Sequence, residues 1–235
     1  MNHFDAIVVG VGGIGSAALA HLARRGLHVL GLEQFQVGHD QGSSHGQTRV
    51  IRQAYFEHPN YVPLLKRAYA LWDALDETAQ QSLFVRSGLV QFGAPSGQVI
   101  RGVEESARIH GLSVERLSSR ELQELAPMLC LPESMVAVYE QSAGYLAVEE
   151  CVRAHARVAV QAGATLLQGE TVQSWKADGS GFVVTTQSDC YSADRLVVTA
   201  GAWSDRLLRD LGVELRVRRK PLLWFGAEEN WERSP

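Results

Sequence analysis

The chain has 235 residues, of which 46% are hydrophobic and 20% are charged, and its formal net charge at pH 7 is −4. This composition can bury the core of one large domain or two small ones, and it argues against a nucleic-acid partner because no long basic run is present. No apolar stretch is long enough to cross a membrane, and the N-terminus enters a predicted strand directly, without a signal peptide. The widely spaced Cys130, Cys151 and Cys190 predict reduced thiols of a cytoplasmic protein, with no metal site.

The first predicted elements form a strand, a glycine-rich turn and a helix. Residues 4–9, FDAIVV, are apolar and β-branched, as in a buried parallel strand. Residues 10–15, GVGGIG, follow, and residues 16–25 have the pattern of a helix that a glycine stops. A second short strand is predicted at 28–32. This order is the dinucleotide-binding fingerprint in its full context, rather than an isolated glycine motif.

Each position of the turn has a physical role in that fingerprint. Gly10 permits the tight turn, and Gly12 lets the backbone approach a pyrophosphate. The N-terminus of the helix that follows faces the phosphate and favours its negative charge. Gly15 lets the helix pack closely against the strand. The alternative is a glycine-rich turn in an α/β unit that binds no nucleotide.

Glu33 closes the second strand, where a carboxylate can accept hydrogen bonds from an adenosine ribose. The same charge repels a 2′-phosphate, which disfavours NADP. FAD and NAD are not distinguished by this unit alone.

The remainder of the chain predicts a mixture of helices and strands. Residues 34–58 form a long polar stretch rich in Gly, Ser and His, and long loops in compact domains are often functional. The helices are expected at 61–76, 99–110, 118–125 and 148–162, and the strands at 85–92, 135–139, 165–167, 172–176, 182–186, 195–200 and 215–225.

This order predicts a discontinuous nucleotide-binding domain at 1–60 and 145–205. A mixed α/β insert occupies 61–144, and the tail 206–235 returns to it. By analogy, an interrupted dinucleotide fold with a separate substrate domain indicates an oxidoreductase.

The stretch 42–52, GSSHGQTRVIR, is the second candidate site. It places His45, Arg49 and Arg52 beside two glycines, which allow the backbone to approach a ligand. The two arginines share a face if the segment is a helix and point to opposite faces if it is a strand. The alternative is a solvated loop with surface arginines.

At this point the chain resembles the monomeric sarcosine oxidase and N-methyl-tryptophan oxidase family, over nearly its whole length. The motifs that carry the resemblance are GVGGIG at 10–15 with Glu33, GSSHGQTRVIRQAY at 42–55, YVPL at 61–64, LW at 71–72, FVRSG at 84–88 and AGAW at 200–203.

The resemblance implies an α/β fold of the D-amino-acid-oxidase type, in which an FAD-binding Rossmann-like domain is interrupted by a mixed α/β substrate domain. It also implies an FAD enzyme, monomeric at full length, that oxidises a secondary or N-methylated amino acid. O₂ would be the electron acceptor, and the products would be an imine and H₂O₂. The partners are then a small amino acid and O₂.

The resemblance also gives roles to the 42–52 stretch. His45 corresponds to a histidine against the flavin, Arg49 to an arginine near the flavin ring, and Arg52 to the arginine that binds the substrate carboxylate. Ser44 and Gln47 replace a histidine and an aspartate of the family pattern, which affects flavin tuning and substrate scope.

Trp203 has two interpretations, as a dinucleotide contact or as an ordinary core aromatic. The residues predicted to bind the cofactor are Gly10, Gly12, Gly13, Ile14, Gly15, Glu33, Gln34, Gly42, Ser43, Ser44, Thr48, Val172, Gly201 and Trp203.

Members of the resembling family extend beyond this sequence and carry a flavin-linking cysteine and lysines in their later half. No cysteine follows Cys190. We therefore expect an N-terminal part that lacks the C-terminal part of the fold and that, alone, neither turns over substrate nor holds flavin covalently. The alternatives are another FAD amino-acid oxidase or dehydrogenase of the same fold, or a truncated, non-catalytic FAD-binding protein.

Overall fold

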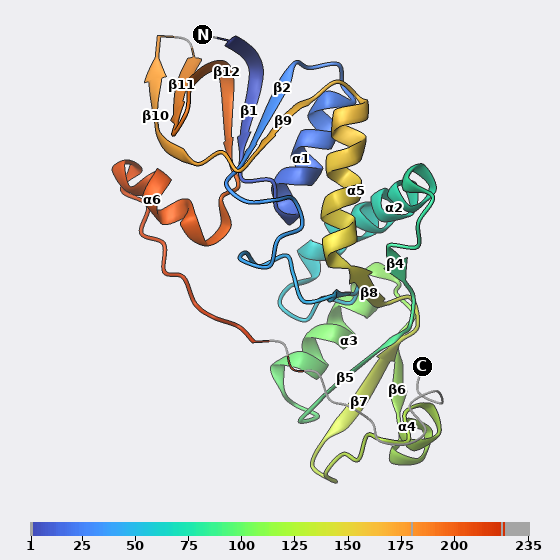
Figure 1. The fold of residues 1–235 in the computed structure, drawn as a ribbon. Coiled ribbons are helices and arrows are strands. Elements are labelled where there is room, and N and C mark those ends of the chain that lie inside the picture. Colours follow the sequence, from blue (N-terminus) through green and yellow to red (C-terminus); the bar gives the residue numbers. More distant parts are fainter. Residues whose placement is uncertain (1, 180, 222, 224–235) are drawn as a thin grey trace. The chain divides into compact units, whose positions relative to one another are not determined.

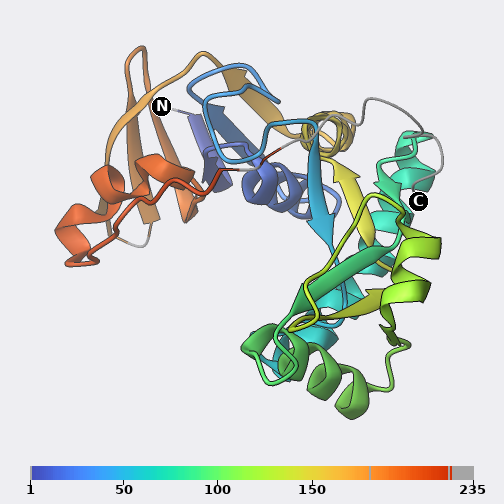
Figure 2. The same cartoon turned by 90° about the horizontal axis from the view of Figure 1, so that it is seen from below.

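The computed structural model describes residues 2–179, 181–221 and 223, and these fold as two compact units (Figure 1, Figure 2). Among the described residues, the first unit takes in 2–48 and 147–221, and the second takes in 49–146 and residue 223. The sequence predicts domain boundaries between residues 60 and 61 and between 144 and 145, whereas the two units meet between 48 and 49 and between 146 and 147. The segment 206–221, which the sequence assigns to the insert, belongs to the first unit.

A six-stranded sheet forms the centre of the first unit, with the strand order β10-β11-β12-β1-β2-β9. β1 pairs in parallel with β12 on one side and with β2 on the other, and β2 pairs in parallel with β9, while β10, β11 and β12 form an antiparallel meander. The strands are β1 (Asn2–Val9), β2 (Val29–Glu33), β9 (Thr165–Gln168), β10 (Val172–Asp178), β11 (Gly181–Thr186) and β12 (Cys190–Val198).

Two helices, α1 (Gly13–Ala23) and α5 (Val148–Gln161), pack against each other beside this sheet (Figure 1). α1 begins three residues before the predicted start, inside the glycine motif. His155 of α5 is 8% exposed, and its ring centroid lies 6.4 Å from that of His21. Burial, followed by the charge of His21, lowers the pKa of His155 to about 4. His155 is therefore neutral in the folded protein near pH 7.

The C-terminal part of the first unit differs from the expectation. β12 begins at Cys190 rather than at 195, because it also pairs with β11. Short helical turns η2 (Gly201–Trp203), α6 (Ser204–Leu208) and η3 (Arg209–Leu211) follow. The strand predicted at 215–225 is wrong at 215–221 and 223, where the chain is irregular; residues 222, 224 and 225 lie outside the described part.

The second unit contains two three-stranded sheets, with orders β3-β8-β4 and β5-β7-β6. The strands are β3 (Thr48–Ile51), β4 (Phe84–Val85), β5 (Leu89–Gly93), β6 (Glu115–Leu117), β7 (Val136–Glu140) and β8 (Gly144–Ala147). The helical segments are η1 (Pro59–Tyr61), α2 (Val62–Ala79), α3 (Gln98–His110) and α4 (Ser119–Leu125). α4 begins with the predicted capping box of Ser118 and Glu121.

The single strand predicted at 85–92 is two strands in different sheets. β4 ends at Val85 and β5 starts at Leu89, and between them Gly88 has φ 78°, which breaks the extended chain.

Within the described part of the chain, no helix combines the length and apolar character needed to span a membrane.

Candidate functional site

A pocket of about 740 Å³ opens in the first unit at the carboxyl ends of its parallel strands. Its wall includes Val9 at the end of β1, Leu32 and Glu33 at the end of β2, and Val198 and Thr199 at the end of β12. In open α/β sheets, ligands bind at this edge. The volume lies within the usual range for small-molecule and cofactor sites.

The glycine turn closes one side of this pocket. Gly10 has φ 88°, and a Cβ there would lie 2.7 Å from the carbonyl oxygen of Thr199. A Cβ at Gly15 would overlap the carbonyl oxygen of Gly10, so α1 packs onto the turn only without a side chain at this position. Gly15 is buried and does not line the pocket, and it therefore shapes the site through packing alone.

The N-terminus of α1 faces the pocket. Gly12 precedes the helix, and Gly12, Gly13 and Ile14 all line the pocket. The amide of Gly13 donates to Ser44 Oγ at 3.0 Å, and a Cβ at Gly13 would come within 2.8 Å of that oxygen. Open helix N-termini lined by glycine suit a pyrophosphate, because free amides and the helix dipole both favour negative charge.

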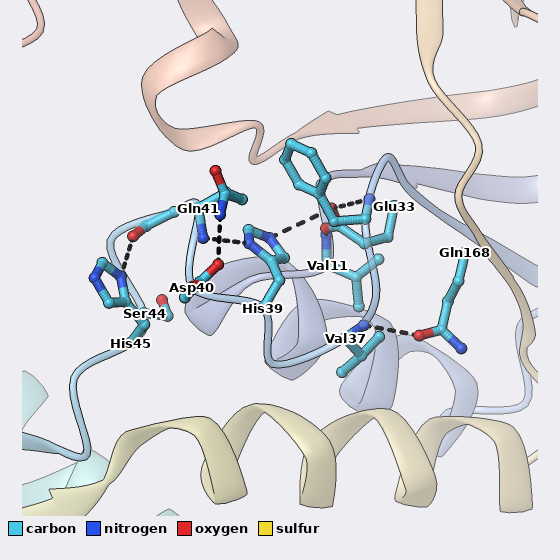
Figure 3. Close-up of polar contacts among 12 residues, drawn as sticks. Val11, Glu33, Val37, His39, Asp40, Gln41, Ser44, His45 and Gln168 are labelled. Atoms are coloured by element: carbon cyan, nitrogen blue, oxygen red, sulfur yellow. Dashed lines mark hydrogen bonds and ion pairs between the residues drawn. The ribbon is translucent and has the colours of Figure 1, made fainter.

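Glu33 is an acidic residue of the pocket wall, and it is only 3% exposed. Its carboxylate accepts the amides of Val11 at 2.8 Å and Phe35 at 3.0 Å, one on each oxygen (Figure 3). Two ionised oxygens provide about four acceptor positions, so this carboxylate keeps capacity for the hydroxyls of a ribose.

His39 lies against Glu33 and was not predicted as a site residue. Its Nε2 is 3.5 Å from Glu33 Oε1, while its Nδ1 accepts the amide of Gln41 at 3.0 Å (Figure 3). The amide contact assigns the proton of a neutral His39 to Nε2, which then points at the carboxylate. The centroid of the His39 ring lies 4.7 Å from that of Phe35, and the Phe35 centroid lies 5.7 Å from that of Trp203.

The pocket brings together most of the residues that the sequence predicted for the cofactor. Those that line it are Gly10, Gly12, Gly13, Ile14, Glu33, Gln34, Gly42, Ser43, Ser44, Val172, Gly201 and Trp203. Trp203 is partly buried as well, so both of its interpretations fit its position. Thr48 does not line the pocket, and its contact with the cofactor stays a prediction.

Sequence reasoning missed several residues of the same wall. Thr199 and Ala200 follow β12, and the rule that ligands bind at the carboxyl ends of parallel strands could have found them. Arg206 of α6 is the only lysine or arginine among the described residues of the wall, and no sequence signal pointed to it. It adds a fixed positive charge to the pocket.

The loop that carries His45 is fastened at two points to the start of α5. The amides of Gly46 and Gln47 donate to the Glu149 carboxylate, at 2.6 and 3.1 Å. Gln47, with φ 69°, also accepts the amide of Val148 at 3.1 Å. Burial alone would raise the pKa of Glu149, but the amide hydrogen bonds outweigh it and lower that pKa. This clamp holds a residue in a conformation that favours glycine.

The imidazole of His45 is held within the same loop, where its Nδ1 contacts the carbonyl oxygen of Gly42 (Figure 3). His45 is not among the residues of the pocket wall. Its placement against the flavin stays a prediction.

Arg49 and Arg52 belong to the second unit, Arg49 on β3 and Arg52 directly after it. Their position relative to the pocket stays a prediction. The guanidinium of Arg52 lies 4.5 Å above the ring of Tyr55 and 3.7 Å from a carboxylate oxygen of Glu57. Its Nε is buried and has no hydrogen-bond partner among the described residues. A partly buried guanidinium with one unsatisfied donor has capacity for an additional anionic partner.

The parallel strands, the glycine turn and the pocket with Glu33 define a dinucleotide-binding fold. Residues 5–225 match the family of FAD-dependent oxidoreductases abbreviated DAO, and the chain belongs to that family. Its cofactor is therefore FAD, which resolves the choice between FAD and NAD that the sequence motif left open.

Curated relatives agree with this family and with the resemblance found in the sequence. The chain is 40% identical over 222 residues to monomeric sarcosine oxidase of Streptomyces avermitilis, and the aligned region covers 94% of this chain and 58% of the relative. It is 36% identical over 225 residues to N-methyl-L-tryptophan oxidase of Salmonella newport, covering 96% of this chain and 60% of the relative. The chain thus spans about three-fifths of the length of these relatives.

Solved structures share the fold. The open form of NikD, described as an unusual amino acid oxidase essential for nikkomycin biosynthesis, superposes with a TM-score of 0.81 at 28% identity, over 92% of this chain and 56% of that one. Glycine oxidase from Geobacillus kaustophilus gives a TM-score of 0.75 at 25% identity, over 92% and 60% of the two chains. The predicted fold class is confirmed.

Proposed function

We propose that the protein oxidises a secondary or N-methylated amino acid, as a monomer, with O₂ as electron acceptor. The amino acid loses two electrons and two protons to become an imine, and O₂ takes them up as H₂O₂. The imine then hydrolyses in water. The observation that carries the proposal is the Arg52 guanidinium, whose buried Nε lacks a partner among the described residues and whose contact with Glu57 is a loose 3.7 Å. It fits the carboxylate that every amino-acid substrate carries.

The first unit fits FAD on the evidence of its own residues. The amides at the α1 N-terminus suit the pyrophosphate, and Glu33 suits the adenosine ribose. Glycines at 10 and 15 permit the tight turn and the close packing of α1 that form this wall. When bound, FAD supplies the capacity to accept the electrons of the substrate C–H bond. We therefore assign the first unit as the FAD-binding domain and the second, with Arg52, as the substrate domain.

The contribution of the chain is to bind and orient. Arg52 would anchor the substrate carboxylate through two parallel hydrogen bonds, which fixes the amine end in one direction. We propose that His45 and Arg49 stand beside the flavin. The Glu149 clamp then acts on the chemistry by holding the His45 loop still, because Gly46 and Gln47 cannot shift without losing their acceptor.

Arg52 is tested in the FAD-loaded protein at full length. Arg52→Ala should leave the flavin absorption spectrum unchanged but raise KM for sarcosine strongly, lower kcat, or both. Arg52→Lys should restore only part of the activity, because ammonium is a point charge without a fork. Arg116→Ala is the matched control, since Arg116 also pairs with a glutamate in the second unit, Glu104 at 3.1 Å. Peroxide release from Arg52→Ala at the parental rate would remove Arg52 from the site.

A second candidate is oxidation of a primary amino acid such as glycine. Two observations favour it: Ser44 and Gln47 depart from the resembling family's pattern, and one structural neighbour is a glycine oxidase. Peroxide release measured with glycine and with sarcosine at equal concentrations separates the two candidates.

We further propose that residues 1–235 expressed alone do not turn over either substrate, because the chain matches only about three-fifths of the length of the relatives.

A further inference from the structure

Glu140, the last residue of β7, is a carboxylate buried to 2% exposure in the second unit. Its Oε1 accepts the amide of Gln53 at 2.8 Å and the hydroxyl of Ser142 at 3.2 Å, and its Oε2 accepts the amide of Ala54 at 3.0 Å. A buried carboxylate is tolerated only when such donors satisfy it. Two of the three donors are backbone groups of a single short segment.

That segment comes directly after Arg52. β3 ends at Ile51, so the amides of residues 53 and 54 have no strand to pair with, and the Glu140 carboxylate takes the place of a strand partner. Ala54 is fully buried and packs in one cluster with Val138, which lies on the same strand as Glu140. The backbone that follows Arg52 is therefore fixed to β7 by both hydrogen bonds and packing.

The groups around the Arg52 guanidinium come from this fixed segment. Besides Tyr55 and Glu57, the ring of Phe56 lies 5.5 Å away. The carbonyl oxygen of Tyr55 accepts the hydroxyl of Ser106 at 2.6 Å, which adds a second anchor. The position of the guanidinium thus follows from the position of residues 52–57 and, through it, from Glu140.

Electrostatics places Glu140 and Arg52 around one group, the buried hydroxyl of Tyr69. Burial and then the negative charge of Glu140 raise the pKa of Tyr69, while the positive charges of Arg86 and Arg52 oppose this rise. The Tyr69 hydroxyl has no hydrogen-bond partner among the described residues. Its surroundings show that the charges of Glu140 and Arg52 act within one local cluster.

We propose that Glu140 is a positioning residue that holds Arg52 in the orientation in which it binds the substrate carboxylate. This inference rests on the proposed function, since it takes Arg52 as the carboxylate anchor. Glu140 itself contacts neither substrate nor cofactor: it acts by accepting two successive backbone amides. Its removal should weaken carboxylate binding without altering how FAD is held.

The test measures the affinity of the FAD-loaded protein for propionate, an unreactive carboxylate, from the change in flavin absorption on titration. Glu140→Gln keeps the shape but turns an NH₂ group toward one of the two amides, so the dissociation constant should rise about tenfold or more. KM for sarcosine should rise in parallel while kcat changes by less than about twofold. Glu140→Asp keeps the charge with a shorter reach and should show a smaller rise. It also decides the matter if Glu140→Gln fails to fold.

Asp76→Asn is the matched control, because Asp76 also accepts two successive amides, those of Leu83 and Phe84, at 3.1 and 3.3 Å. It should leave propionate affinity unchanged. The double variant Arg52→Ala/Glu140→Gln should bind propionate no more weakly than Arg52→Ala alone, because the second change acts through a side chain already removed.

Parental affinity in Glu140→Gln, or in Glu140→Asp where only that variant folds, would overturn the inference. So would an equal loss in Asp76→Asn, or multiplied losses in the double variant. If Arg52→Ala loses affinity and Glu140→Gln does not, the inference alone fails. If Arg52→Ala itself binds propionate like the parent, the role proposed for Arg52 fails and the inference falls with it.

Discussion

Replacing Glu33 tests the cofactor pocket most directly, because its carboxylate serves the fold and the proposed ligand at once. It is 3% exposed and accepts two backbone amides, Val11 and Phe35. Glu33→Ala would leave both amides without an acceptor, whereas Glu33→Gln keeps one carbonyl oxygen and nearly the same volume. Glu33→Gln is therefore the more informative change.

The expected magnitudes follow from these contacts. In Glu33→Gln both amides lose a charged acceptor, and one of them faces an NH₂ group instead of an oxygen. Hydrogen bonds to charged groups are worth about 1.5–3 kcal/mol, so the free energy of unfolding of the apoprotein should fall by about that amount. The ribose hydroxyls lose a charge-assisted acceptor, which should weaken FAD binding by about 1–3 kcal/mol, or about 5- to 150-fold in Kd.

The assay titrates apoprotein with FAD and follows flavin fluorescence, with urea unfolding of the apoprotein measured alongside. Glu170→Gln is the control, because Glu170 also lines the pocket but bonds the exposed Ser188 instead of the glycine turn. It should retain parental affinity. A Glu33→Gln variant that loses stability but binds FAD with parental Kd would show that Glu33 supports the fold only, and the argument for its ribose contact would be refuted.

Two further predictions concern the same unit. The pKa of His155 is about 4 in the folded protein and 6.5, its ordinary value, in the unfolded chain. Between these pH values the unfolded chain binds more protons than the folded protein. The free energy of unfolding should therefore be highest above pH 6.5 and should fall by about 3 kcal/mol as the pH drops to 4. Urea unfolding across this range checks the slope, which His155→Leu should flatten and His3→Leu, on a side chain 59% exposed, should not. Gly15→Ala should prevent folding of the first unit, because its Cβ would overlap the carbonyl oxygen of Gly10. Gly12→Ala should fold, because its Cβ would meet only Ser44 Oγ at 3.9 Å, but it should bind FAD more weakly. Circular dichroism and FAD titration separate the two outcomes, and a folded Gly15→Ala protein would contradict the packing argument.

The sequence was most informative where the groups that cooperate are neighbours along the chain. The glycine turn, the helix after it and Glu33 lie within about one βαβ unit. Their spacing along the chain is enough to predict that the unit binds a dinucleotide. The capping box of α4 was predicted for the same reason, since both of its partners lie within one helical turn.

Contacts between distant segments were beyond sequence reasoning. Glu140 holds residue 53 across 87 positions, Glu149 holds Gly46 across 103, and neither glutamate stands in a recognisable motif. The strands β3, β6 and β8 are only three or four residues long, too short for an alternating pattern to emerge. In contrast, Leu215 and Val217 do alternate, but they are 43% and 64% exposed and pair with no strand among the described residues.

The place of β1 in its sheet has a consequence for synthesis on the ribosome. β1 emerges long before β12, which is its neighbour on one side, with Asn2 opposite Tyr191, a separation of 189 residues (Figure 1). At about 5–20 residues per second, that side of β1 waits about 10–40 s for its partner. During this interval an apolar strand presents an open edge to other nascent chains. Slower initiation or bound chaperone should therefore raise the yield of folded protein.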